Sequence, residues 1–308
     1  PKCEAFLFKK MKMKKWHINV ESVFTKVFSD KNQKGVERAT LWLSIIGFIS
    51  HLLLIYAKKF ELFVTPFEAS LLDDPISAIY TPFSIILIYE IYLLVLNLPR
   101  SFTTSVSKQF EIISLILIRR IFADIPKIDL NADWLSTPPN LQLICDVLGV
   151  LALYYLIHLF NNGRLRLPSK PLNPKLESFV SSKKAVSLIL LPLLIFISIY
   201  SGVNWIYDMF YYHIGSDINS IFYNEFFSIL ILADVFILLL SFQYTERYSQ
   251  LIRNTGFVIC TILIRLSFGV SGLTNVALII SSAVFGLLIL TIYNIRENPK
   301  KEKEAIKI

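Results

Sequence analysis

Eight stretches of this sequence are apolar over about the length that a helix needs to cross a lipid bilayer, and this constrains the fold more than any other feature. A membrane-spanning helix takes roughly 17 to 25 mostly apolar residues. The 54% share of hydrophobic residues and the mean hydropathy of +0.57 also exceed those of a typical soluble protein. We therefore expect an all-α polytopic membrane protein with eight transmembrane helices, over residues 40–57, 79–98, 109–125, 140–160, 186–203, 225–243, 256–272 and 275–294.

The last two stretches are almost continuous in the sequence. Gly272 and the polar residues Thr274 and Asn275 separate them. Glycine beside polar residues is typical of a turn, so a tight hairpin is predicted. One long helix or a re-entrant helix is the alternative.

Basic residues fall on one side of the membrane when the loops are assigned to alternate sides. With the N-terminus inside, the inner segments hold 25 of the 31 Lys and Arg residues; these segments are 1–39, 99–108, 161–185, 244–255 and 295–308. Cytoplasmic segments of membrane proteins carry this excess, so both termini are predicted to be cytoplasmic. The same bias explains the net charge of +8 without nucleic acid as a partner.

Residues 1–39 are predicted to form a basic cytoplasmic arm. Trp16, Val20, Phe24 and Val27 recur in it at helical spacing, beside a lysine-rich flank. This pattern predicts an interfacial helix on the inner leaflet, held by apolar insertion and by anionic lipids. A mobile solubilising arm is the alternative.

The chain contains an internal duplication. "DPISAIYTPFSIILIYEIYLLVL" matches "DINSIFYNEFFSILILADVFILLL", and "SKQFEIISLILIRRIF" matches "IRNTGFVICTILIRLSF". The offset is 143 residues between Tyr80 and Tyr223, and 146 residues between Arg119 and Arg265. Because each half would hold an even number of spans, the two halves are predicted to run parallel in the membrane.

The predicted organisation then has five parts. The two repeats share a four-helix plan, and the segments between and after them are basic and cytoplasmic. The parts are the arm at 1–39, the first four-helix repeat at 40–160, the linker at 161–185, the second four-helix repeat at 186–294 and the tail at 295–308.

Arginines stand inside two of the apolar stretches, where a charged side chain is costly. Arg119 and Arg265 lie about ten residues into their predicted helices, near the middle of the bilayer at about 1.5 Å per residue. A central arginine costs from about 2.5 to more than 10 kcal/mol, so each should face the bundle interior and have a partner. Glu90 and Asp234 lie at similar depth on the preceding helices. We expect the pairs Glu90 with Arg119 and Asp234 with Arg265.

Arg120 is an extra charge in the first half. It points about 100° away from Arg119 around the helix. Asp124, four residues further along, and Asp146 on the fourth helix are both candidate partners. The second half has Leu266 and Val270 at the positions that match Arg120 and Asp124. The first half is thus the more polar one and the better candidate for the working half.

Two interpretations of these buried pairs stay open. In the structural one, they fix the register of the helices within a static bundle. In the functional one, they belong to a proton or ion relay, a voltage sensor or an anion site. The lack of an arginine at every third position along one helix counts against a voltage sensor.

The first half resembles the phosphate-starvation-inducible PsiE family of bacterial inner-membrane proteins. The residues that carry the resemblance are Glu90 on the second helix and Arg119 and Asp124 of "LIRRIFAD" on the third. The second half is similar through Asp234 and "ILIRLSFG" but lacks the trailing aspartate. The resemblance implies a tandem version of a four-helix unit, a location in the bacterial inner membrane and a role in a stress response. It does not define a molecular activity.

The sequence lacks nucleotide-binding loops, metalloprotease motifs, hydrolase elbows and cysteine pairs at metal-binding spacing. We therefore expect no enzymatic activity, no cofactor and no metal site. The preferred function is the movement of ions, protons or a small solute, with Glu90 and Arg119 central. The alternative is a membrane adaptor or stress sensor that binds a cytoplasmic protein or a second copy of the chain, with purely structural ion pairs.

Overall fold

In a computed structural model of the chain, the described residues form a bundle of long helices with no strand among them. The described residues are 19–61, 74–125, 128, 134–166, 174–211, 218–245, 247–270 and 272–297. The helices are α2 (Asp30–Lys59), the 3₁₀ helix η2 (Pro75–Ile79), α3 (Tyr80–Asn97), α4 (Phe102–Asp124), α5 (Pro138–Leu165), α6 (Pro174–Tyr211), α7 (Ile218–Phe242), α8 (Tyr248–Ser267) and α9 (Leu273–Glu297). A short helical stretch over residues 19–27 precedes α2.

Residues that favour helix ends stand where the helices begin and end. Ser101 caps α4 by accepting a hydrogen bond at 3.3 Å from the backbone N–H of Thr104. Asp74 does the same for η2 at 2.9 Å from the N–H of Ile76. Gly272 has a φ of +72° just before α9, a conformation that glycine adopts at little cost. α8 and α9 are therefore separate helices that pack against each other.

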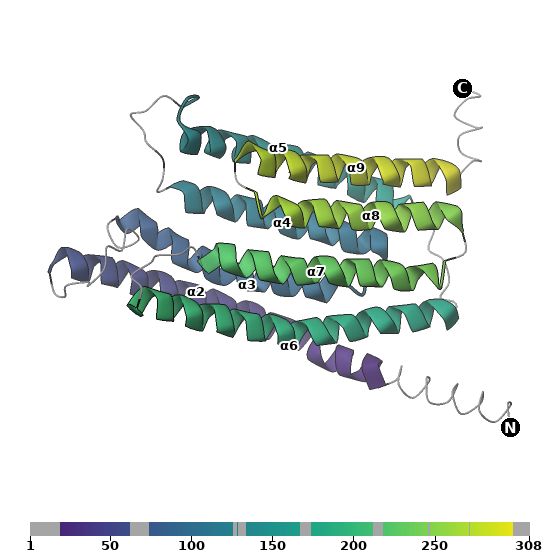
Figure 1. Ribbon diagram of the computed structural model, residues 1–308, viewed down its shortest axis with the longest axis horizontal. Helices are drawn as coiled ribbons and strands as arrows, with labels where there is room; N and C mark the ends of the chain where they lie inside the picture. Colours follow the sequence, from purple (N-terminus) through teal and green to yellow (C-terminus); the bar gives the residue numbers. More distant parts are fainter. Residues whose placement is uncertain are drawn as a thin grey trace.

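The helices lie side by side in two layers (Figure 1), with α2 to α5 behind α6 to α9 in that view. Consecutive helices are in contact within each half of the chain. Between the halves, α5 contacts α9, α4 contacts α8 and α3 contacts α6. The two helices that carry the predicted intramembrane arginines, α4 and α8, therefore meet at the interface between the halves.

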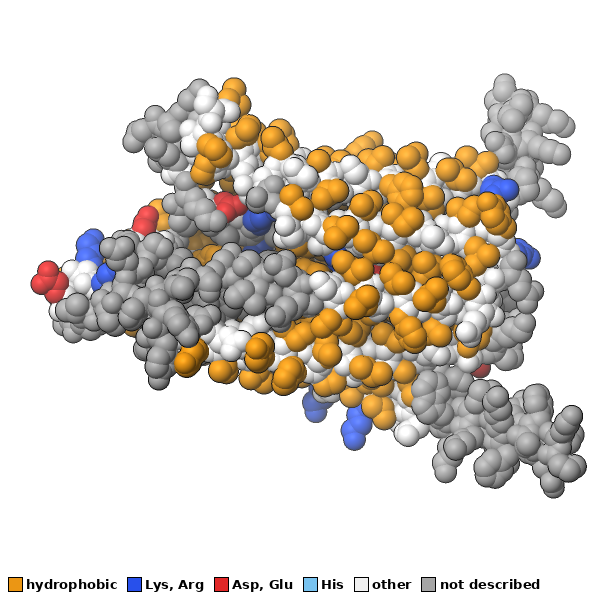
Figure 2. Space-filling view, viewed as in Figure 1, with side chains coloured by type: hydrophobic (Ala, Val, Ile, Leu, Met, Phe, Trp, Pro, Cys, Tyr) orange, Lys and Arg blue, Asp and Glu red, His pale blue; other side chains and the backbone are white. Residues whose placement is uncertain are grey.

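The interior of the bundle is apolar and the outside is apolar as well. Aromatic and aliphatic side chains fill the core, among them Phe110, Phe160 and Phe257. Figure 2 shows that hydrophobic side chains also cover much of one face of the bundle. Trp42, at 65% exposure, is one of many large apolar residues on the outside. A surface this apolar is typical of a protein that faces lipid or a partner.

Five helical segments in the described part of the chain are long and apolar enough to cross a membrane. They are Asn19–Lys59, Pro75–Asn97, Pro138–Leu165, Leu176–Ser201 and Leu273–Arg296. The apolar part of α7, Phe226–Phe242, is shorter. α4 and α8, which carry Arg119 and Arg265, are not among these five segments. The chain is an all-helical protein with several helices suited to a membrane.

The helices extend well beyond the apolar stretches of the sequence. α4 begins at Phe102 rather than near residue 109, and α8 begins at Tyr248 rather than near 256. The predicted linker 161–185 is largely helical, because α5 continues to Leu165 and α6 begins at Pro174. Polar residues such as Thr103, Thr104 and Gln109 form helix when it packs against neighbours, although they interrupt an apolar pattern. The tail after Glu297 lies outside the described residues.

Glycines bring α5 and α9 close together across the two halves. A Cβ atom added at Gly149 would lie 2.5 Å from Cγ1 of Val276, and one added at Gly163 would lie 3.0 Å from Cδ2 of Leu290. Small residues at such contacts let helix backbones approach closely. Nδ2 of Asn294 adds a hydrogen bond of 2.9 Å to the carbonyl oxygen of Gly163. This α5–α9 seam joins the fourth helices of the halves.

The described part of the predicted arm packs against the bundle. The Phe28 side chain is buried, and its ring lies 6.0 Å from the ring of Tyr92 on α3. Lys184 on α6 forms an ion pair with Glu21 and lies 5.5 Å from the ring of Phe24. The apolar stripe of the arm therefore contacts protein as well as any lipid. Trp16, the first residue of that stripe, lies outside the described residues.

Candidate functional site

The first acid–arginine pair joins α3 and α4 inside the bundle. Nε of Arg119 lies 3.2 Å from Oε2 of Glu90 and donates a hydrogen bond to it. Nη1 of Arg119 donates a second hydrogen bond, at 3.1 Å, to the carbonyl oxygen of Phe83. Glu90 and Arg119 are 4% and 6% exposed. The structure thus brings together the two residues that the sequence analysis pairs.

The second pair joins α7 and α8 in the same way. Nη1 of Arg265 lies 2.6 Å from Oδ2 of Asp234, and both side chains are buried. The short distance makes this an ion pair, although the N–H direction falls short of a hydrogen bond. Oδ2 of Asp234 accepts a hydrogen bond of 2.6 Å from the Thr261 hydroxyl, one turn from Arg265 on α8. Equivalent helices of the two halves therefore carry equivalent pairs.

Both arginines lie nearer the ends of their helices than the middle. Arg119 stands five residues before α4 ends, and Arg265 stands two residues before α8 ends. This differs from the central position expected from the apolar stretches, because α4 and α8 begin earlier than those stretches do. Helical side chains lean toward the N-terminus of their own helix, which directs each arginine back toward the interior.

Arg120 takes Asp146 as its partner rather than an acid on its own helix. Its Nε donates to Oδ2 of Asp146 at 2.9 Å, and its Nη2 contacts Oδ1 at 2.5 Å. This two-pronged geometry is the strongest that arginine and a carboxylate form. Asp146 on α5 is fully buried, whereas the Arg120 side chain is 23% exposed. The contact ties α4 to α5.

The remaining predicted residue, Asp124, is the last residue of α4 and is half-buried. The described hydrogen bonds of Arg120 go to Asp146, not to Asp124. In the second half, the matching positions Leu266 and Val270 are exposed on the bundle surface. The extra charges of the first half therefore have no counterpart in the second half of the described chain.

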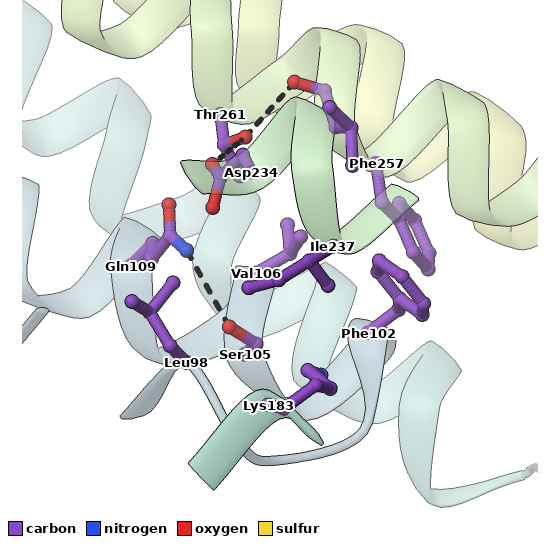
Figure 3. Close-up of a pocket in the computed structure, with 11 residues that line it drawn as sticks. Leu98, Phe102, Ser105, Val106, Gln109, Lys183, Asp234, Ile237, Phe257 and Thr261 are labelled. Atoms are coloured by element: carbon purple, nitrogen blue, oxygen red, sulfur yellow. Dashed lines mark hydrogen bonds between the residues drawn. The ribbon is translucent and has the colours of Figure 1, made fainter. Parts of the chain in front are cut away.

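A small cavity, lined by both polar and apolar side chains, lies between the two halves, beside Asp234 (Figure 3). Its volume is about 20 Å³. The first half lines it with Ser105 and Gln109 of α4, and the second half lines it with Lys183 of α6, Asp234 and Thr261. Figure 3 shows these side chains arranged around one space, with Lys183 and Asp234 on opposite sides of it. Such a volume is enough for one water molecule.

Lys183 is the charged residue at this cavity that the sequence analysis misses. It is 2% exposed, and its ammonium group donates to the carbonyl oxygen of Arg100 in the turn between α3 and α4. The ammonium lies 4.7 Å from the ring of Phe102 and 5.5 Å from the ring of Phe179. Both are cation–π distances. The sequence places Lys183 in a lysine-rich segment, which made it look like a cytoplasmic charge.

A second polar group that the sequence analysis misses lies between α4 and α5. The Ser107 hydroxyl donates to Oδ1 of Asn161 at 2.5 Å, and Nδ2 of Asn161 donates to Oε1 of Glu111 at 3.4 Å. Glu111 also pairs with Lys108 at 2.5 Å. These residues precede the arginines on α4. They give the helix a polar interior face near the end where α4 begins.

Taken together, the buried carboxylates of the described residues belong to neutral pairs with arginine, whereas Lys183 is a buried cation held by a carbonyl oxygen and two rings. Each of the carboxylates of Glu90, Asp146 and Asp234 has an arginine within hydrogen-bonding distance. Such carboxylates can accept a proton, and the freed arginine must then find another partner or a water molecule. In the described residues, no group of three or more His, Cys, Asp or Glu side chains is placed to hold a metal ion.

Comparison with known proteins leaves the geometry as the guide to function. No family model, no curated protein and no solved structure matches this chain.

Proposed function

We propose that this chain is a multi-pass protein of the bacterial inner membrane that moves protons, without enzymatic activity, by way of its buried acid–arginine pairs. The observation that carries the proposal is the recurrence of a buried pair in each half, Glu90 with Arg119 and Asp234 with Arg265. Ionisable side chains within membrane-spanning helices often mark ion paths and proton relays.

The membrane arrangement in this proposal has eight spans in two parallel four-helix repeats, with both termini in the cytoplasm. Five segments meet the length and apolarity that crossing needs, and their neighbours pack alongside them. α2 begins and α9 ends at the same end of the bundle in Figure 1. The basic residues gather in the segments assigned to that side.

The size of the cavity beside Asp234 favours protons over larger cargo. A volume of about 20 Å³ admits one water molecule but no hydrated ion or metabolite. The charge arrangement favours protons as well. A carboxylate that takes up a proton releases its arginine, and loss of that proton restores the pair. The two halves would then offer two such exchange points, one at Glu90 and one at Asp234.

The test is proton flux in liposomes that contain the purified protein. An internal pH-sensitive dye reports flux under a potassium diffusion potential. We expect Glu90→Gln to remove most of the protein-dependent flux, because an amide cannot take up the proton. The matched control is Asp30→Asn, the same chemical change at an exposed position on α2. Equal flux in liposomes with and without the wild-type protein would refute the proposal.

A membrane adaptor is the second candidate, and the packing of the arm favours it. Glu21 and Phe24 contact Lys184, so the described end of the arm is held against the bundle. Residues 1–18 carry six lysines that a cytoplasmic acidic partner or anionic lipid could bind. Deleting residues 1–18 should then abolish partner capture while leaving the bundle folded. Proton flux that survives this deletion unchanged favours the first proposal.

A further inference from the structure

The cavity beside Asp234 combines residues from both halves of the chain. α4 of the first half contributes Ser105 and Gln109, which are 5% and 3% exposed. The second half contributes Lys183 from α6 and Asp234 from α7. Neither half alone contains the full set. Burying polar groups costs free energy unless they are hydrogen-bonded, so a set of them drawn from both halves needs a reason beyond packing.

The polar groups follow one another from the end of the bundle toward Asp234. At the outer edge, Lys183 donates to the carbonyl oxygen of Arg100, which lies in the exposed turn between α3 and α4. Nε2 of Gln109 then donates to the hydroxyl of Ser105 at 3.4 Å, one turn along α4. Thr261 donates to Asp234 at the inner edge. Figure 3 shows Ser105 and Gln109 along one side of the space between Lys183 and Asp234, beside the apolar side chains of Val106 and Ile237.

The distance from the end of the bundle to the carboxylate of Asp234 is short. Asp234 stands eight residues before α7 ends at Phe242, which is about 12 Å at 1.5 Å per residue. Gln109 stands seven residues after α4 begins at Phe102. Both helices have these ends at the end of the bundle where α2 begins and α9 ends (Figure 1). One water molecule with a hydrogen bond on each side spans about 6 Å, so the cavity water would cover about half of this depth and the polar side chains of the path would cover the rest.

We propose that this cavity is a one-sided water entry path, through which Asp234 is reached from the side of the membrane where α2 begins and α9 ends. Lys183 is its gate, since its ammonium group is held across the outer edge by Arg100, Phe102 and Phe179. The inference rests on the proposed function, which places the bundle in a membrane. It adds the side of the membrane from which protons reach Asp234.

Proton transfer along this path balances with water alone. A proton from bulk water passes to the cavity water, and that water passes a proton to the carboxylate of Asp234, which becomes a neutral acid. The charged groups that face Asp234 are Arg265 from α8 and Lys183 from α6, whereas α4 presents the neutral side chains of Ser105 and Gln109.

The test uses cysteine accessibility in oriented vesicles, with Cys3, Cys145 and Cys260 replaced by serine. Gln109→Cys should react with Ag⁺, a thiol-reactive cation that is no larger than a water molecule when bare, if it is added from the side of the N-terminus, and not if it is added from the opposite side. Ile112→Cys is the control, because Ile112 is 4% exposed, lies in the apolar core and does not line the cavity. Lys183→Ala in the Gln109→Cys background should speed the reaction several-fold.

Reaction from the opposite side, or no more reaction at position 109 than at position 112, would overturn the inference. Radiolytic hydroxyl labelling of the wild-type protein gives a check without any variant. Leu98 and Phe102, which line the cavity, should be oxidised more than Ile113 and Ile116 in the dry core. Failure of proton flux together with one-sided labelling would remove the proposed function and keep the entry path. Proton flux without one-sided labelling would keep the proposed function and remove the entry path.

Discussion

The pair formed by Glu90 and Arg119 offers the sharpest test of how buried charge acts in this bundle. Glu90→Leu removes the carboxylate and leaves the guanidinium of Arg119, 6% exposed, with the carbonyl oxygen of Phe83 as a described hydrogen-bond partner. Breaking a buried pair by removing one partner costs about 3 to 5 kcal/mol, because an uncompensated charge remains. We expect Glu90→Leu to lower the free energy of unfolding by that amount.

The double variant Glu90→Leu/Arg119→Met should recover most of this loss. Leucine and methionine fill similar volumes without charge, and buried pairs replaced in this way are often neutral or more stable by about 1 to 4 kcal/mol. The predicted coupling between the two sites is therefore at least about 2 kcal/mol. Arg119→Met alone should cost less than Glu90→Leu alone, because a carboxylic acid can take up a proton and become neutral.

The assay is reversible unfolding in mixed micelles, with the free energy measured for the wild type, both single variants and the double variant. Helix content by circular dichroism shows that each variant starts from the same fold. If the two single losses simply add in the double variant, the side chains do not interact and the argument for a buried pair fails. A double variant that folds but conducts no protons would separate stability from the proposed function.

Two further predictions concern contacts between helices. Gly149→Ala should lower the free energy of unfolding by about 1 to 3 kcal/mol, because its Cβ would lie 2.5 Å from the stiff side chain of Val276. The control is Gly35→Ala, which has open space around its Cβ and should stabilise α2 by about 0.5 to 1 kcal/mol. Asp146→Ala should cost about 1 to 3 kcal/mol, less than Glu90→Leu, because the Arg120 side chain is 23% exposed and can turn its charge outward. Unfolding in the same micelles measures both, and equal losses for Gly149→Ala and Gly35→Ala would contradict the close approach of α5 and α9.

Apolar patterning predicts where the helices lie but not how far they extend. Each of the eight apolar stretches overlaps one of the helices α2 to α9. The stretch at 109–125 misses the first turns of α4, since Thr103, Thr104 and Ser105 are polar yet packed inside the bundle. Length and composition qualify five helical segments of the described chain to cross a membrane.

A charged residue within an apolar stretch predicts that it has an oppositely charged partner. It says less about the other groups that surround it. Arg119 and Arg265 each face an acid on the preceding helix because a lone guanidinium among hydrocarbon is too costly. Asp146, one of two candidates for Arg120, takes the contact because its carboxylate faces α4 from the neighbouring helix. The sequence analysis does not predict that Lys183 is buried, because lysine-rich segments are typically exposed to water. Its place in a stripe with Phe179, Ser187 and Leu190, spaced three and four residues apart, was the available signal.

The contacts of Lys183 and Lys184 set an order for assembly during synthesis. The ribosome makes the α3–α4 turn and residues 19–28 long before it reaches position 183. Until α6 is made and packs against the bundle, the carbonyl group of Arg100 and the carboxylate of Glu21 lack these two lysine donors. The α3–α4 turn and residues 19–28 therefore complete their contacts late in synthesis, when one turn of α6 binds both of them through Lys183 and Lys184.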